Sequence, residues 1–207
     1  AGSPPRAHSR TPCISICAGR VLLLFAVCGA VPTDLCYNHS RIKTNQEMDI
    51  VTVDRQKVLD AFAAYIRPYD AQDPKVRLKI HHTYRVAALC EQIGRSIALE
   101  GTALDLAWLC GMLHDVGRFE QLRRFGTFDD SKSIDHARAG VQVLFEQGHI
   151  RDYLDDDSED AMLRTAVEWH SAYRLPDGLD ERTVMYCNIL RDADKIEILR
   201  VNVEPPL

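Results

Sequence analysis

The chain has 207 residues, of which 46% are hydrophobic and 7% aromatic, so it is long enough for one domain with a sizeable core. Its formal net charge is −5 at pH 7, and beyond residue 47 acidic residues outnumber basic ones by 28 to 20. This balance argues against a protein that binds a nucleic acid duplex, because such proteins present a basic surface to the phosphates.

The first 47 residues differ in composition from the rest. They hold four of the seven cysteines and an apolar run, Val21–Val31, that is too short to span a bilayer but is typical of a signal peptide. We favour a different interpretation, in which Met48 is the natural start, residues 1–47 are non-native upstream sequence, and the protein is cytoplasmic and not membrane-bound. The other three cysteines lie in apolar segments, as reduced core cysteines do. A genuine signal would instead make the protein secreted or periplasmic.

Residues 48–207 are expected to form the domain proper. Apolar side chains at a spacing of three to four residues predict helices over 53–66, 74–99, 102–115, 134–147, 158–171 and 180–200. No strand-like alternation persists between them, so the predicted fold class is all-α, a single helical bundle. Two prolines close the last helix soon after residue 200.

The adjacent residues His114 and Asp115 end the most apolar of these helices. Leu104–Leu113 contains one charged residue in ten and predicts a helix that is buried almost all round. A carboxylate at such a place destabilises the fold unless it is paired, hydrogen-bonded or bound to a cation. Gly117, just beyond, is expected to mark the end of the helix. The pair alone indicates either a helix cap or a metal site.

Four more residues of metal-binding types lie on separate predicted helices. Together with the pair they follow the order His, His-Asp, His, His, Asp, and the intervening segments have 31, 20, 33 and 23 residues. A helical bundle can assemble a metal centre from side chains on facing helices. Four imidazoles and two carboxylates are more than one tetrahedral ion uses, which predicts a binuclear metal centre bridged by the carboxylate of the pair. The predicted ligands are His82, His114, Asp115, His136, His170 and Asp194.

The first of these ligands has a neighbour of the same type, His81. Leu78, His82, Val86 and Leu89 lie at helical spacing, so His82 is predicted to share a face with core leucines. His81 then points about 100° away. We therefore expect His81 to be exposed or to lie outside the ligand set.

These residues and the segments around them resemble the HD superfamily of metal-dependent phosphohydrolases, whose signature is a His, then His-Asp, then a distant Asp. The segments are HTYRV, LHDVGR, DHARAG and RDADKIE, and the resemblance covers roughly Met48 to Arg200. It implies an HD-domain bundle, and the two additional His residues imply its binuclear group, with two divalent metal ions (Mn, Fe, Ni, Zn or Mg). Members commonly continue with further helices, so we expect a chain truncated at its C-terminus.

Charged side chains near the pair are candidates for catalysis and substrate binding. Arg118 matches the basic residue that many family members place after the pair, and a guanidinium can grip and neutralise phosphate, so Asp115 and Arg118 are predicted to be catalytic. Glu120 is a third catalytic candidate, as a proton acceptor. Arg85, Lys132 and Arg118 are the candidates for phosphate binding. For Arg118, Glu120 and the other candidates a surface ion pair or a solvated side chain is the structural alternative.

The expected function is hydrolysis of a small phosphorylated substrate, a phosphomonoester or phosphodiester such as a nucleotide, by a metal-activated water. Two alternatives keep the same ligands. The resemblance extends to HD-type oxygenases with a mixed-valent diiron centre, and a regulatory HD module would bind a nucleotide without hydrolysing it. The segment after His170 lacks the second His and the Gly-Tyr-Pro of HD-GYP phosphodiesterases, so a cyclic dinucleotide is not predicted. The oligomeric state is left open.

Overall fold

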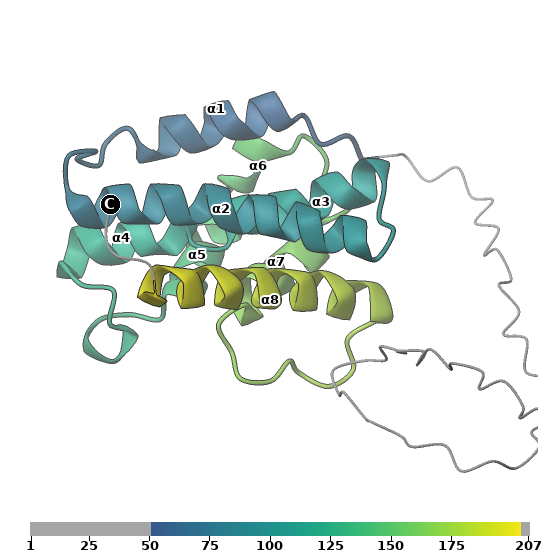
Figure 1. Cartoon of the computed structure of the whole chain (residues 1–207). Coiled ribbons are helices and arrows are strands. Elements are labelled where there is room, and N and C mark those ends of the chain that lie inside the picture. The colour runs from purple at the N-terminus through teal and green to yellow at the C-terminus, as the bar shows by residue number, and fades with distance from the viewer. Residues whose placement is uncertain (1–50, 204–207) are drawn as a thin grey trace, which may run out of the picture. The chain divides into compact units, whose positions relative to one another are not determined.

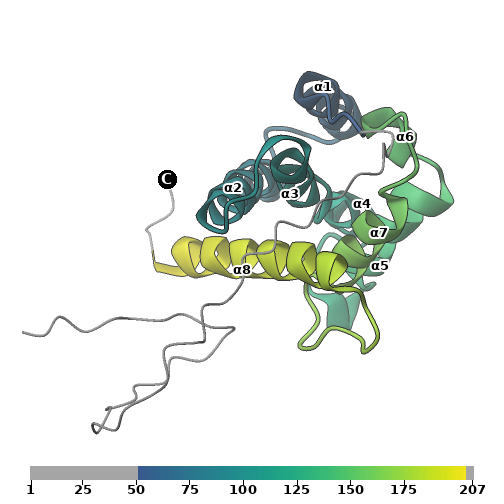
Figure 2. The same cartoon turned by 90° about the vertical axis from the view of Figure 1, so that its right-hand side faces the viewer.

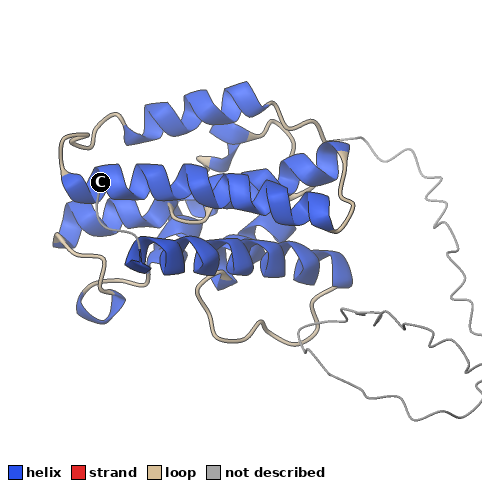
Figure 3. Ribbon diagram, in the orientation of Figure 1, coloured by secondary structure: helices blue, strands red, loops and turns tan. Residues whose placement is uncertain are grey.

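In the computed structural model, residues 51–203 are described, and every regular element among them is a helix, which confirms the all-α prediction (Figure 1, Figure 3). The predictions for residues 1–47 lie outside the described residues. The elements are α1 Arg55–Ile66, α2 Pro74–Ser96, α3 Gly101–Leu113, α4 Val116–Phe125, the 3₁₀ turn η1 Asp130–Lys132, α5 His136–Val141, the π-helical turn η2 Gln142–Glu146, α6 Ile150–Tyr153, α7 Asp160–Trp169 and α8 Glu181–Val203.

Helix α2 packs against α3 on one side and α8 on another, so it is central to the bundle. Helix α4 packs against α5, and α7 lies against both α5 and α8. Helix α1 covers α3 and the short α6. Figure 1 shows α2 and α8 running side by side, and the turned view in Figure 2 shows α8 lying below both α2 and α3. The ends of the shorter helices can thereby meet beside these two long ones.

Helix α3 is buried almost all round, as its composition predicts. Every side chain from Leu106 to Leu113 is buried, and the one charged residue of the run, Asp105, reaches the surface to pair with Arg55. The three cysteines of this part of the chain, Cys90, Cys110 and Cys187, are free and buried. Helix α3 is therefore the centre of the core, and the residues that directly follow it, His114 and Asp115, are buried inside the protein.

A helix does end near Gly117, but Gly117 does not cause the end. The chain leaves the helical conformation at Asp115, with φ −106° and ψ 16°, and a new helix, α4, begins at Val116 with Gly117 inside it. A Cβ on Gly117 would overlap the backbone of α5 at the carbonyl oxygen of His136 and the amide nitrogen of Gly140. The glycine is needed for this close approach of two helices rather than for a cap.

Other predicted boundaries also shift. Helix α2 ends at Ser96 rather than at residue 99, and the segment predicted as one helix over 134–147 is α5 followed by the π-helical turn. Leu78 is 45% exposed, so the buried face around His82 is formed by Val86 and Cys90 and not by Leu78. Within residues 51–203, no helix is both long and apolar enough to cross a lipid bilayer.

Candidate metal centre

The structure brings all six predicted ligands together, and each is buried, with at most 8% of its surface exposed. Three of them lie within helices, and the other three lie directly at helix ends. One lies within α2 and one within α8, two occupy the break between α3 and α4, one begins α5, and one directly follows α7. In that order they are His82, Asp194, His114, Asp115, His136 and His170. His81, the neighbour of the first, is exposed, as predicted.

The first ligand group is defined here as His82, His114 and Asp194. Its two imidazoles face one oxygen of Asp115, and Asp194 faces the two imidazoles. The Nε2 atom of His82 lies 3.0 Å from Asp194 Oδ1 and 3.3 Å from His114 Nε2. Both imidazole Nε2 atoms lie 3.5 Å from Asp115 Oδ2. The donor atoms of His82, His114 and Asp115 all lie within 4.8 Å of one another, and Asp194 Oδ1 lies beside them, 3.7 Å from His114 Nε2.

The other oxygen of Asp115 faces the second ligand group, His136 and His170. Their Nε2 atoms are 3.0 Å apart and lie 3.7 and 3.8 Å from Asp115 Oδ1. The carboxylate of Asp115 thus stands between the two groups with one oxygen turned to each, and the two sets of donor atoms share no other residue.

Hydrogen bonds on the far side of the rings determine which imidazole nitrogens are free. Nδ1 of His170 lies 2.7 Å from the carbonyl oxygen of Val167, and Nδ1 of His136 lies 2.6 Å from the carboxylate of Asp130. Because these oxygens only accept, each Nδ1 carries the hydrogen and each Nε2 presents a lone pair. Two lone pairs that face each other across 3.0 Å repel unless a cation or a proton lies between them, so this arrangement fits a metal ion.

Burial and neighbouring charges shift the pKa values of the four imidazoles in different directions. Burial lowers the pKa of His82 and of His136, and burial together with the charge of His114 lowers the pKa of His170 to about 3. His114 differs, because Asp115 and Asp194 together outweigh its burial and raise its pKa. Burial thus favours the neutral form of both imidazoles of the second group, which is the form that binds metals.

The two carboxylates are ionised despite their burial. Burial opposes the charge on Asp115, but the ammonium of Lys79 and the imidazoles around it hold the pKa of Asp115 well below its usual range. Burial likewise opposes the charge on Asp194, but the hydrogen bond from His82 and the charge of His114 outweigh it and lower the pKa of Asp194 to about 2. Both groups can therefore bind a cation without first losing a proton.

The side chains predicted to bind substrate are less uniformly placed. Arg118 lies beside the centre, with Nε 3.5 Å from Asp115 Oδ1, but its Nη1 donates to Gln121, to the carbonyl of Phe128 and to Asp130. Arg85 is 3.5 Å from Glu197 on α8. Lys132 has an exposed side chain that pairs with Asp129. The roles assigned to these cations stay predictions.

Glu120, predicted as a catalytic proton acceptor, has partners on the side of α1 and α4. Its Oε1 accepts a hydrogen bond from Tyr69 at 2.7 Å, and its Oε2 pairs with Arg123 at 2.7 Å. No contact joins it to either ligand group among the residues that the structure describes. Its catalytic role also stays a prediction.

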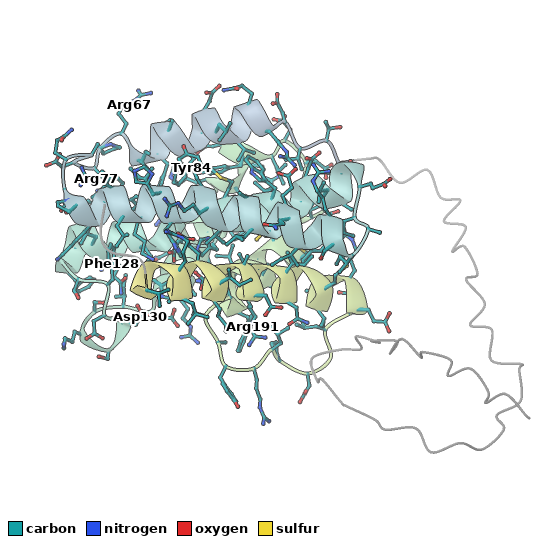
Figure 4. The ribbon with its side chains drawn as sticks, viewed as in Figure 1. Arg67, Arg77, Tyr84, Phe128, Asp130 and Arg191 are labelled. Atoms are coloured by element: carbon teal, nitrogen blue, oxygen red, sulfur yellow. The ribbon has the colours of Figure 1, made fainter. Side chains whose placement is uncertain are left out.

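Two residues that contact the predicted ligands, Lys79 and Asp130, were not predicted from the sequence. Lys79, one helical turn before His82, places its Nζ 2.6 Å from Asp115 Oδ2. Asp130 orients His136, as described above, and lies with Phe128 in the segment between α4 and α5 (Figure 4). The spacing of Lys79 to His82 on one helix was a usable signal, since residues three apart share a face. The Asp130 contact depends on the shape of a loop, which no periodicity reports.

Buried polar contacts hold the segments that carry these residues. Gln121 is fully buried, and its amide donates to Asp130, to Ser133 and to the carbonyl of Ile134. Arg191 of α8 donates to the carbonyls of Ala172 and Tyr173, and so fastens the chain just after α7 (Figure 4). The segment before His136 and the segment after His170 are therefore each held in place by a side chain of a neighbouring helix.

A buried cluster of His and Asp side chains within a helical bundle is typical of a metal-binding helical domain. The HD domain family model matches residues 80–199 of this chain, a span that contains all six clustered residues. Because the match covers more than half of the chain, the protein belongs to the HD domain family, and the cluster is consistent with the divalent metal site of such a domain. Comparisons with curated proteins and with solved structures returned no match.

Proposed function

We propose that this protein is a metal-dependent phosphohydrolase that binds two divalent cations and hydrolyses a small phosphorylated substrate. The observation that carries the proposal is the position of Asp115, which turns one oxygen to each ligand group. In this scheme His82, His114 and Asp194 would hold one ion, His136 and His170 would hold the other, and Asp115 would be a ligand to both. The HD domain family, which includes metal-dependent phosphohydrolases, supports this reading of the site.

The donor set favours some metals over others. Four imidazoles with two carboxylates suit Mn, Fe, Ni or Zn better than Mg, which prefers oxygen ligands alone. When bound, such ions lower the pKa of a water molecule and polarise a phosphoryl oxygen, the two requirements for phosphoester hydrolysis near neutral pH.

The residues of the chain contribute position and charge. The carbonyl of Val167 and the carboxylate of Asp130 each fix the Nδ1 hydrogen of an imidazole, so the Nε2 lone pairs need no reorientation before binding. The guanidinium of Arg118 lies beside Asp115 and is the proposed partner of the charge that develops on the phosphoryl group. Arg85 and Lys132 are proposed to attract the anionic substrate.

The test combines metal analysis with a substrate panel on the full chain. The protein is stripped with a chelator and reloaded separately with Mn and Fe. Bound metal is then measured by mass spectrometry, and phosphate release is assayed on mono- and diesters, including nucleotides. We expect two ions per chain and turnover of at least one ester. One ion or none would refute the binuclear site, and oxygen consumption by the iron-loaded protein without phosphate release would favour oxygenase chemistry instead.

A further inference from the structure

Lys79 is the cation whose head group lies nearest to the candidate centre. Its Nζ is 2.6 Å from Asp115 Oδ2, and only 15% of its side chain is exposed. The ammonium also lies 5.4 Å from the centre of the Phe128 ring, which belongs to the segment between α4 and α5 (Figure 4). The side chain is therefore enclosed between the ligands on one side and this segment on the other.

The other cations near the centre have partners of their own. Arg118 donates to three oxygens of α4 and of the segment after it, Arg85 faces Glu197, and Lys132 pairs with Asp129. For Lys79, Asp115 is the one anion within ion-pair distance among residues 51–203. Within the described part of the chain, the anionic partner of this ammonium is thus a predicted metal ligand.

A metal ion would compete for the same oxygen. Asp115 Oδ2 is the atom that faces the first ligand group, 3.5 Å from both of its imidazole nitrogens. A divalent cation bound there would repel an ammonium 2.6 Å from the shared oxygen, and the repulsion is large because the site is buried. The ammonium would then need another anion within the reach of a flexible four-carbon chain.

We infer that Lys79 binds the phosphoryl group of the substrate and, when no metal is present, occupies the place of the cation on Asp115. This inference rests on the proposed function, because it takes a phosphate bound at the metal centre as the new partner. The ammonium has three donors and no preferred plane, so it can follow a phosphate oxygen as the substrate approaches. Lys79 is therefore a residue for substrate binding that acts beside the ligands, not one of them.

The test compares Lys79→Met, which keeps the length of the side chain and removes the charge, with Lys75→Met as a matched control. Lys75 lies one turn earlier on α2 and is exposed, and its Nζ donates to the carbonyl of Gly126. Binding of inorganic phosphate to the Mn-loaded full chain is measured by calorimetry. We expect Lys79→Met to weaken phosphate binding about 10- to 100-fold, as the loss of a hydrogen bond to a charged group implies, and Lys75→Met to leave it unchanged.

Two further measurements separate this role from a structural one. Bound Mn should be the same or tighter in Lys79→Met, because a like charge has been removed, whereas the melting temperature of the metal-free variant should fall, because Asp115 loses its partner. Lys79→Arg should keep most of the phosphate affinity. Phosphate binding within twofold of wild type, or loss of Mn in Lys79→Met, overturns the inference. A wild-type chain that binds Mn and phosphate but hydrolyses no ester overturns the proposed function and leaves the role of Lys79 intact.

Discussion

The two ligand groups on either side of Asp115 are built in different ways. The first takes His82 and Asp194 from the interiors of α2 and α8, each 23 residues long and packed along each other. The second takes His136 from the first residue of α5, which has six residues, and His170 from the end of α7, which has ten. A residue inside a long packed helix is held by contacts over several turns, whereas the end of a short helix depends on its connections.

This difference predicts that the second group is more easily disturbed from outside the ligands. Its position depends on the backbone contact of α4 with α5 at Gly117 and on the loop of residues 126–135, which carries Asp130. The first group has no comparable dependence on a loop in the described part of the chain. Substitutions can therefore separate the two groups.

The largest effect is expected from Asp115→Ala, which removes the one residue common to both groups. We expect bound metal to fall from two ions per chain to near zero and turnover to be lost with it, because the second group would keep only two donors and the first group would lose the carboxylate that it shares with the second. Metal analysis of the reloaded variant is the measurement. Asp60→Ala on the exposed face of α1 is the control and should bind metal as wild type does. If Asp115→Ala kept one ion, the groups would be independent and the bridge would be refuted.

A smaller effect, on stability as well as on the second group, is expected from Gly117→Ala. The added Cβ would overlap backbone atoms of α5, which cannot move aside as a side chain can, so we expect the free energy of unfolding to drop by about 3 kcal/mol. Urea denaturation of the metal-free protein measures this.

Gly94→Ala on α2 is the control for Gly117→Ala. Its Cβ would lie 2.9 Å from Cδ1 of Leu104, the movable end of a side chain. Since alanine also has the better helix propensity, we expect the stability to change by less than about 1 kcal/mol. Equal losses in the two variants would show that the contact of α4 with α5 is not special.

The first group could be predicted from the sequence more fully than the second. His82 was distinguished from His81 by helical spacing, because α2 is long enough for a periodic pattern to show which face is buried. The same argument wrongly placed Leu78 in the core, although this residue near the start of α2 is 45% exposed. Periodicity identifies a face but not how much of it a neighbour covers.

The surroundings of the second group could not be predicted from the sequence, because they depend on tertiary contacts. The sequence predicts that Gly117 ends a helix. In the structure, Gly117 instead lets α4 approach the backbone of α5, which begins about 20 residues further along the chain. Helix α4 was therefore missed, and with it the contacts by which Arg118 and Gln121 hold Asp130. Such contacts depend on the tertiary arrangement, and local propensity carries no signal of them.

The smallest and most selective effect is expected from Asp130→Asn, which keeps the size of the side chain but replaces the carboxylate that holds Nδ1 of His136. We expect the second ion to bind about 10- to 100-fold more weakly, the usual cost of losing such a supporting hydrogen bond, while the first ion binds as before. Titration of the stripped protein with Mn against a competing chelator resolves the two affinities. Asp129→Asn is the matched control, because the neighbouring Asp129 contacts Ser131 and Lys132 rather than a ligand. Equal weakening of both ions in Asp130→Asn would mean that the two groups respond as one unit, and the contrast between long helices and loop-held helix ends would not explain how this centre is held.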